Sequence, residues 1–64
     1  MDIGSKIAKI RREKNIKQTY VAHRLNKTTA WLCNLEKGKR GINTQTLCDI
    51  ARVLDVDVAS FFAK

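Results

Sequence analysis

The sequence predicts an all-α domain built from five short helices. The chain has no proline and only three glycines in 64 residues, and its apolar residues recur at the three- and four-residue spacing of amphipathic helices. An apolar fraction of 44% with 30% charged residues is typical of a globular domain rather than a disordered chain. A chain of this length is expected to form one domain, residues 1–64, around a single small core.

The first helix is predicted over about residues 3–14, because Ile3, Ile7 and Ile10 share one face and charged residues fill the other. Asn15 is expected to end it, since asparagine enters the left-handed conformation that helix ends commonly use. A second helix is predicted over about residues 18–25, with Asn26 as its stop. Its expected core residues are Val21, Ala22 and Leu25.

The third helix is predicted over about residues 28–36, with Thr28 as its N-cap and Leu32 and Leu35 facing inward. A charged segment bounded by Gly38 and Gly41 indicates an exposed loop. The fourth helix is expected to start at Asn43 or Thr44 and to bury Leu47, Ile50, Ala51 and Leu54. A fifth, short helical turn is expected after Asp57, with Val58, Phe61 and Phe62, and Phe61 is assigned to the core.

Positive charge is concentrated in the first two thirds of the chain. The formal net charge is +7; residues 1–43 hold eleven basic and three acidic residues, net +8, and residues 44–64 hold two and three, net −1. Such asymmetry indicates one surface that meets a polyanion, although a merely solvated basic face is the alternative. No segment approaches the roughly 20 apolar residues of a membrane span, and no signal-peptide core is present, so a cytoplasmic protein without a membrane partner is expected.

One internal spacing predicts a helix-turn-helix. It runs from Gln18 through Ala22 and Asn26 to Leu32 and Leu35. A small residue at 22 lets two helices approach closely, a left-handed residue at 26 makes the sharp turn, and the two leucines hold the second helix against the first. An ordinary helical hairpin would match one or two of these positions by chance, so five matches favour the motif.

Residues 3–62 resemble the Cro and phage-repressor (lambda-repressor-like) helix-turn-helix domains, also called the XRE family. The motifs that carry the resemblance are Ile3-Gly4, Ile7, Ile10, Arg11, Gln18, Ala22, Leu32, Leu35, Glu36-Lys37-Gly38-Lys39-Arg40, Leu47, Ile50-Ala51, Leu54 and Val56. The resemblance implies a compact five-helix DNA-binding domain that dimerises on a palindromic operator. The chain is most similar to small stand-alone regulators, including the controller proteins of restriction-modification systems. It departs from the family at Asn26, usually glycine, and at Lys17, usually a Ser or Thr cap.

In a helix-turn-helix the third helix lies in the major groove of DNA. The residues expected to contact bases are Thr28, Thr29, Ala30, Trp31 and Asn34. The amide of Asn34 can pair with adenine N6 and N7, and Thr29 and Ala30 suit thymine methyl groups. Two interpretations of Trp31 remain open. Its ring contacts a sugar-phosphate or a thymine methyl group, or it is a partly buried aromatic side chain that packs on the second helix.

Phosphate contacts, which set register without reading sequence, are expected from residues around the turn and the charged loop. They are Gln18, Lys27, Lys37, Lys39, Arg40 and Asn43. The family resemblance implies a largely buried structural ion pair between Arg11 and Glu36, and two exposed charges are the alternative. Residues 44–64 carry more apolar side chains than the core can take, so Val53, Val56 and Phe62 are expected at a homodimer interface that fits an inverted-repeat operator.

Nothing in the sequence indicates an enzyme, a catalytic residue, a cofactor or a small-molecule ligand. Cys33, Cys48 and His23 are too few for a structural zinc site, which needs four ligands, so no metal is expected. The expected function is a bacterial or phage, nucleoid-associated transcriptional regulator of its own or neighbouring genes. The alternative is a protein-interaction module, an antirepressor or antitoxin-like adaptor, that retains the helix-turn-helix fold.

Overall fold

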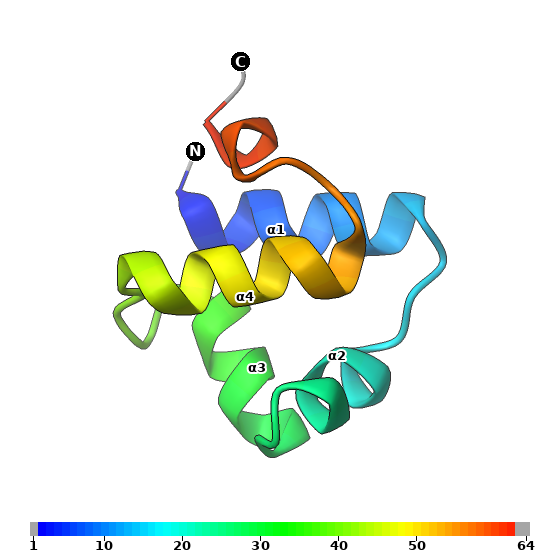
Figure 1. Cartoon of the computed structure of the whole chain (residues 1–64). Helices are drawn as coiled ribbons and strands as arrows, with labels where there is room; N and C mark the ends of the chain where they lie inside the picture. Colours follow the sequence, from blue (N-terminus) through cyan, green and yellow to red (C-terminus); the bar gives the residue numbers. More distant parts are fainter. Residues whose placement is uncertain (1, 63–64) are drawn as a thin grey trace.

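A computed structural model describes residues 2–62 and contains four α-helices followed by one turn of 3₁₀ helix (Figure 1). The elements are α1 (Ile3–Glu13), α2 (Gln18–Arg24), α3 (Thr29–Glu36), α4 (Thr44–Leu54) and η1 (Val58–Phe61). The all-α class is confirmed. The predicted short helical turn after Asp57 is present, but the count of five helices is not confirmed as α-helices, because this last segment closes through i→i+3 hydrogen bonds, as from Ser60 N–H to the Asp57 carbonyl at 2.9 Å, which are the bonds of a 3₁₀ turn.

Three of the four α-helices begin with a side-chain cap. Oxygens of Asp2, Thr28 and Asn43 accept backbone N–H groups of α1, α3 and α4 at 2.7 to 3.1 Å. These bonds satisfy amide groups that have no partner inside the helix. α2 begins after Lys17, which gives no side-chain cap.

The same motif ends each α-helix within residues 2–62. A residue in the left-handed conformation follows or closes the helix: Asn15 (φ 58°), Asn26 (62°), Gly38 (79°) and Asp55 (57°). In each case the next residue's N–H donates to the carbonyl five positions earlier, at 2.8 to 3.0 Å, which is the Schellman geometry. The predicted stops at Asn15 and Asn26 are confirmed.

The core is formed by inward-facing side chains of all five elements. Its buried members are Ile7, Val21, Ala22, Leu32, Leu35, Leu47, Ile50, Ala51, Leu54 and Phe61. Ile3, Ile10 and Leu25 are only half-buried at the edge of this core. α3 packs against both α1 and α2, while η1 packs against α1 and α4. No helix in residues 2–62 is long and apolar enough to cross a membrane.

Gly4 permits an unusually close approach between α1 and the end of α3. A Cβ atom at this position would lie 2.8 Å from the Glu36 carbonyl oxygen and would collide with the Leu35 carbonyl oxygen as well. Both obstacles are backbone atoms, which cannot move aside as a flexible side chain can. The absence of a side chain at Gly4 therefore fixes how closely α3 sits on α1.

Candidate nucleic-acid interface

A buried charge pair joins α1 to the C-terminal end of α3. Arg11 Nε donates to Glu36 Oε2 at 2.8 Å and Nη2 donates to Oε1 at 3.2 Å, while Nη1 donates to the Ile16 carbonyl at 2.8 Å. Arg11 is 7% exposed and Glu36 6% exposed. This is the arrangement that the family resemblance implied, and its two-point geometry restricts the rotation of α3.

Gln18 extends this network to α2. Its side-chain Nε2 donates to Glu36 Oε1 at 2.8 Å, so Glu36 accepts hydrogen bonds from residues of both α1 and α2. Sequence reasoning assigned Gln18 to a phosphate and missed this bond. Eighteen positions separate Gln18 from Glu36, and only the packing of α2 on α3 brings them together.

The outer face of α3 is polar and uncharged. Thr29, Ala30 and Asn34 are exposed, whereas Trp31 is half-buried against the core. Thr28 precedes the helix, and its hydroxyl oxygen accepts the Trp31 N–H at 3.1 Å, so this oxygen already serves the N-cap. The one acidic residue of α3, Glu36, is turned inward.

Exposed cationic and polar residues lie in the two segments next to this helix, the turn before α3 and the loop after it. They are Lys27, Lys37, Lys39, Arg40 and Asn43. Asn43 also caps α4, its Oδ1 accepting the Thr46 N–H at 2.7 Å, which leaves the side-chain NH₂ as its donor group. The structure therefore places five of the six predicted phosphate-binding residues on the surface and holds the sixth, Gln18, in the charge network.

A polar hollow of about 430 Å³ lies where α1, the start of α2 and the start of α3 meet. Its lining residues are Arg11, Arg12, Lys17, Gln18, Thr19 and Thr29. Sequence reasoning did not assign Arg12, Lys17 or Thr19 to the interface. The available signal was the missing cap at Lys17, since an uncapped helix start exposes amide groups that favour an anion.

Comparison with known proteins identifies this arrangement. Residues 7–61 match the model of the helix-turn-helix family HTH_3. The chain belongs to the XRE-type helix-turn-helix family. This family consists of DNA-binding transcriptional regulators.

Two individual proteins are similar to this XRE-type domain. The uncharacterized HTH-type transcriptional regulator y4dJ of Sinorhizobium fredii (strain NBRC 101917 / NGR234) is 37% identical over 54 residues, which cover 84% of this chain and 70% of that protein. The crystal structure of the clp gene regulator ClgR from C. glutamicum superimposes with a TM-score of 0.91 at 20% sequence identity, covering 94% of this chain and 78% of the other. At that identity the structural match establishes the fold.

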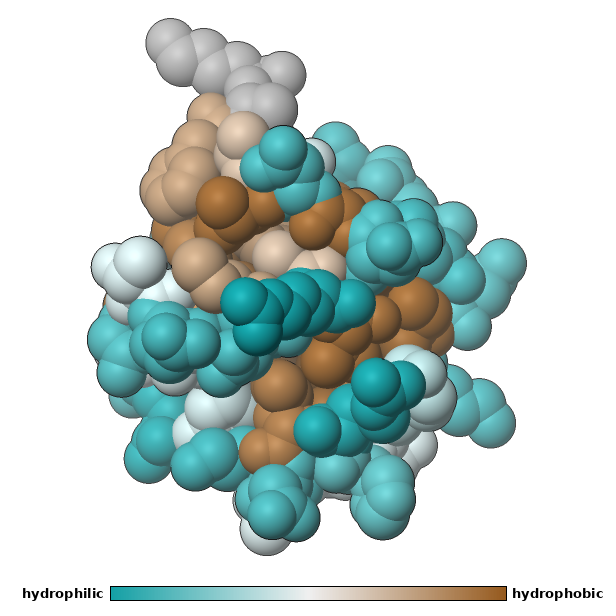
Figure 2. All heavy atoms as spheres, viewed as in Figure 1, coloured by the Kyte–Doolittle hydropathy of each residue, from teal (hydrophilic) through white to brown (hydrophobic). Residues whose placement is uncertain are grey.

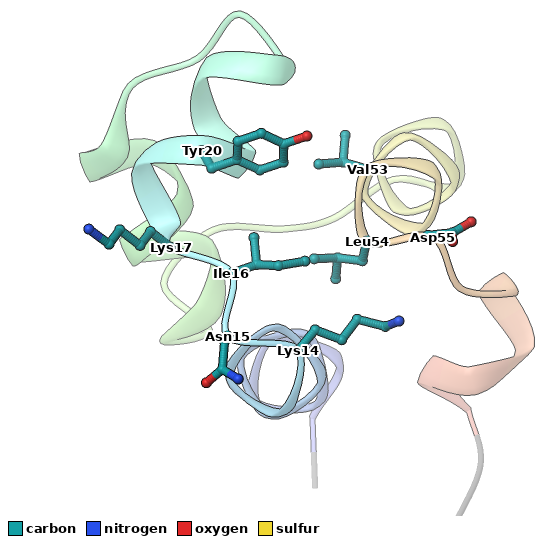
Figure 3. Close-up of a pocket in the computed structure, with 8 residues that line it drawn as sticks. All are labelled: Lys14, Asn15, Ile16, Lys17, Tyr20, Val53, Leu54 and Asp55. Carbon is teal, nitrogen blue, oxygen red and sulfur yellow. The ribbon is translucent and has the colours of Figure 1, made fainter.

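The XRE-type domain has a second, largely apolar groove of about 660 Å³ between the α1–α2 loop, α2 and the end of α4 (Figure 3). Tyr20 and Val53 face each other across it, and Ile16 and Leu54 meet beneath them. Lys14, Asn15, Lys17 and Asp55 complete the lining. None of the predicted base-contacting residues lines this groove, whereas Val53, one of the predicted dimer residues, forms part of its wall.

Apolar side chains gather on the face formed by α4 and η1 (Figure 2). Val53, Val56 and Val58 are half-buried there, and Phe62 is 64% exposed. The structure thus leaves the three predicted dimer residues, Val53, Val56 and Phe62, accessible at least in part, and buries Phe61 as expected.

Proposed function

We propose that this chain is a sequence-specific transcriptional regulator that binds an inverted-repeat operator as a homodimer, with α3 in the major groove. One observation carries the proposal: the exposed face of α3 is free of acidic groups, the segments directly before and after it expose cationic side chains, and a buried charge pair holds the helix in place. The name of the S. fredii relative, a transcriptional regulator, supports the same assignment.

Base recognition falls to the outer face of α3 and its cap, residues Thr28, Thr29, Ala30 and Asn34. The Asn34 amide offers a donor and an acceptor that match adenine N6 and N7 in the major groove. The methyl groups of Thr29 and Ala30 suit thymine C5-methyl groups. Trp31 is more buried than these residues, so its ring lies at the edge of this face rather than on it.

Phosphate binding falls to Gln18, Lys27, Lys37, Lys39, Arg40 and Asn43, joined by Arg12 and Lys17 at the polar hollow. These groups bracket α3 on the side of α2 and on the side of the α3–α4 loop. Contacts on both sides fix the register of the helix on the duplex without reading its sequence.

A second copy covers the apolar face of residues 44–64 through Val53, Val56 and Phe62. Charge supports this occupant: two lysines, Lys14 and Lys17, outnumber the one acid, Asp55, in the lining of the groove beside Val53, and the segment that leads to Phe62 gives a second copy the acidic side chain of Asp57 to set against them. A two-fold axis through this face would place two recognition helices about one DNA turn, roughly 34 Å, apart.

The regulator controls its own gene or neighbouring genes in the cytoplasm, and its own concentration sets the amount of DNA-binding dimer. The decisive test is binding to the intergenic DNA beside its own gene. An inverted repeat there should be protected, and affinity should fall by roughly 10³ to 10⁵ between 50 and 200 mM salt if a dimer neutralises about 8 to 10 phosphates. A protein-interaction module would show no such binding, and a salt-independent signal would overturn the proposal.

Two variants separate base recognition from phosphate binding. Asn34→Ala should weaken binding to the best operator by roughly 1 to 3 kcal/mol and relax the preference at one base pair. Lys39→Ala, the matched control, should weaken binding equally on all sequences and reduce the salt slope by about one. A uniform loss for Asn34→Ala would remove that residue from base recognition.

A further inference from the structure

Trp31 lies at a junction of three segments rather than standing free on the outer face of α3. Its ring is half-buried against the core. A small hollow of about 50 Å³ beside it is lined by Leu25 and Lys27 from the helix-turn-helix turn and by Thr46 and Asp49 from α4. Trp31 therefore borders one hollow together with residues of the turn and of the fourth helix.

Two cations from separate segments lie against this ring. Lys27 Nζ is 5.5 Å from the ring centroid and the guanidinium carbon of Arg40 is 6.0 Å from it. Both distances are within the range of cation–π attraction, for which tryptophan is the best partner. Lys27 belongs to the turn before α3 and Arg40 to the loop after it, so one side chain holds a cation on each side of the recognition helix.

We propose that Trp31 is a positioning residue that holds Lys27 and Arg40 in place for two DNA phosphates, one on each side of α3. The inference rests on the proposed DNA-binding function. It assigns the ring neither to a base contact nor to packing alone. Lysine and arginine side chains lose rotamer freedom when they bind a phosphate, and a ring that already restricts them in the free protein reduces that loss on binding.

The same cation can contact the ring and a phosphate together. The ring face attracts the positive charge, whereas a phosphate accepts hydrogen bonds from N–H groups that point away from the ring. Arg40 lies in an exposed loop with two glycines nearby, Gly38 and Gly41, where an unrestrained side chain would sample many positions. Trp31 supplies an anchor at that point.

A double-mutant cycle on DNA affinity tests this role, using a duplex of arbitrary sequence because phosphate contacts do not depend on sequence. Trp31→Leu should weaken binding roughly three- to tenfold, as expected for losing two partly exposed cation–π contacts. Trp31→Phe, which keeps an aromatic face, should retain most of the wild-type affinity. In a Lys27→Gln/Arg40→Gln background, Trp31→Leu should have no further effect, because the ring then has no cation to hold.

Lys39→Gln is the matched control. It removes a cation from the same loop as Arg40, but the cations that lie against the ring are Lys27 and Arg40. Its effect should add to that of Trp31→Leu. A cost of Trp31→Leu that persists in the Lys27→Gln/Arg40→Gln background would show that the ring itself touches DNA and would overturn the positioning role. Loss of affinity by Trp31→Leu and Trp31→Phe alike would also overturn it.

Proton NMR of the free protein provides a second readout. The side-chain methylene protons of Lys27 and Arg40 should be shifted upfield by the ring current in the wild type and in Trp31→Phe, and should return to ordinary positions in Trp31→Leu. Unshifted protons in the wild type would overturn the inference. Failure of the wild type to bind any duplex would overturn the proposed function and this role with it, whereas binding with an additive cycle would overturn the role of Trp31 alone.

Discussion

Glu36 accepts hydrogen bonds from Arg11 of α1 and Gln18 of α2 while lying on α3, so one carboxylate joins the three N-terminal helices. The residue types alone did not predict this network. Arginine and glutamate are usually exposed, and only the family resemblance implied their burial as a pair. The third partner, Gln18, came from the structure.

Removing one member of this pair should destabilise the fold much more than removing both. Arg11→Met leaves the Glu36 carboxylate buried without its cation, which typically costs about 3 to 5 kcal/mol. The free energy of unfolding of a domain with so small a core is of similar size, so this variant should be largely unfolded at 25 °C. In Arg11→Met/Glu36→Leu no charge remains buried, and much of the stability should return. Urea unfolding followed by circular dichroism measures both, and equal losses in the two variants would argue against a paired, buried carboxylate.

Asp2 should give part of the domain's stability a dependence on acid pH. The backbone N–H of Ser5 donates to its carboxylate and lowers the pKa of Asp2 from the ordinary value of 3.8, because the hydrogen bond favours the charged form. The stabilisation is therefore complete above pH 3.8 and is lost as the pH falls through the lower pKa of the folded state. Between pH 7 and pH 2.5 the urea midpoint should fall further for the wild type than for Asp2→Asn, which cannot titrate. Equal falls would show that the cap does not depend on charge.

At the scale of the helices, the sequence predicted most boundaries because they depend on local chemistry. Thr28, Asn15 and Asn26 act through hydrogen bonds and backbone preferences within a few residues of themselves, and these positions could be read directly. The left-handed conformation of Asp55 was not predicted, although aspartate is also enriched in that conformation. The 3₁₀ form of η1 could not be predicted, because α and 3₁₀ turns have the same short apolar pattern and packing on α1 and α4 selects between them.

Substitutions at Asn26 should reveal the strain of the helix-turn-helix turn. Asn26→Ala should lower the free energy of unfolding by about 1 to 2 kcal/mol, because a Cβ without a compensating polar group is disfavoured at φ 62°. Asn26→Gly should equal or exceed the wild type, since glycine has no such restriction. Asn34→Ala is the control: it lies inside α3 on the exposed face, where alanine is the better helix former, and it should not destabilise. Thermal unfolding gives the order, and an Asn26→Ala domain as stable as the wild type would contradict this account of the turn.

At the scale of the whole molecule, the basic and the nearly neutral parts of the sequence contribute to different surfaces. The turn before α3 and the α3–α4 loop, which carry basic residues, lie at the two ends of α3 (Figure 1), while apolar side chains of the nearly neutral C-terminal third gather on α4 and η1 (Figure 2). The groove of Figure 3 could not be predicted, because it forms where the α1–α2 loop meets the end of α4, and two helices, α2 and α3, separate these elements in the sequence. Hydrophobic periodicity indicates which residues face inward but not where packed elements leave a hollow.

The oligomeric state tests the proposal that the surface around α3 binds DNA and the face of α4 and η1 forms the dimer. A domain that extends 28 × 22 × 20 Å places one recognition helix in one major groove, so an inverted repeat needs two copies held together. Phe62 is the most exposed large apolar side chain of residues 2–62. Two-fold symmetry buries it twice, at about 1.5 to 3 kcal/mol for each fully buried ring. Because only the exposed 64% of each ring is left to bury, the pair contributes at least about 2 kcal/mol, and Phe62→Ala should weaken self-association at least about 30-fold, measured by sedimentation equilibrium.

The folded monomer should be unaffected by this change, because Phe62 is 64% exposed and its neighbour Phe61 occupies the core. His23→Ala, an exposed substitution on α2, is the matched control and should leave self-association unchanged. On DNA, Phe62→Ala should bind a single half-site as well as the wild type does but should lose the additional affinity for the full inverted repeat, since only the dimer engages both halves. If the variant and the wild type sediment with the same mass at every concentration, the copies do not associate through this face, and another surface must place the second recognition helix.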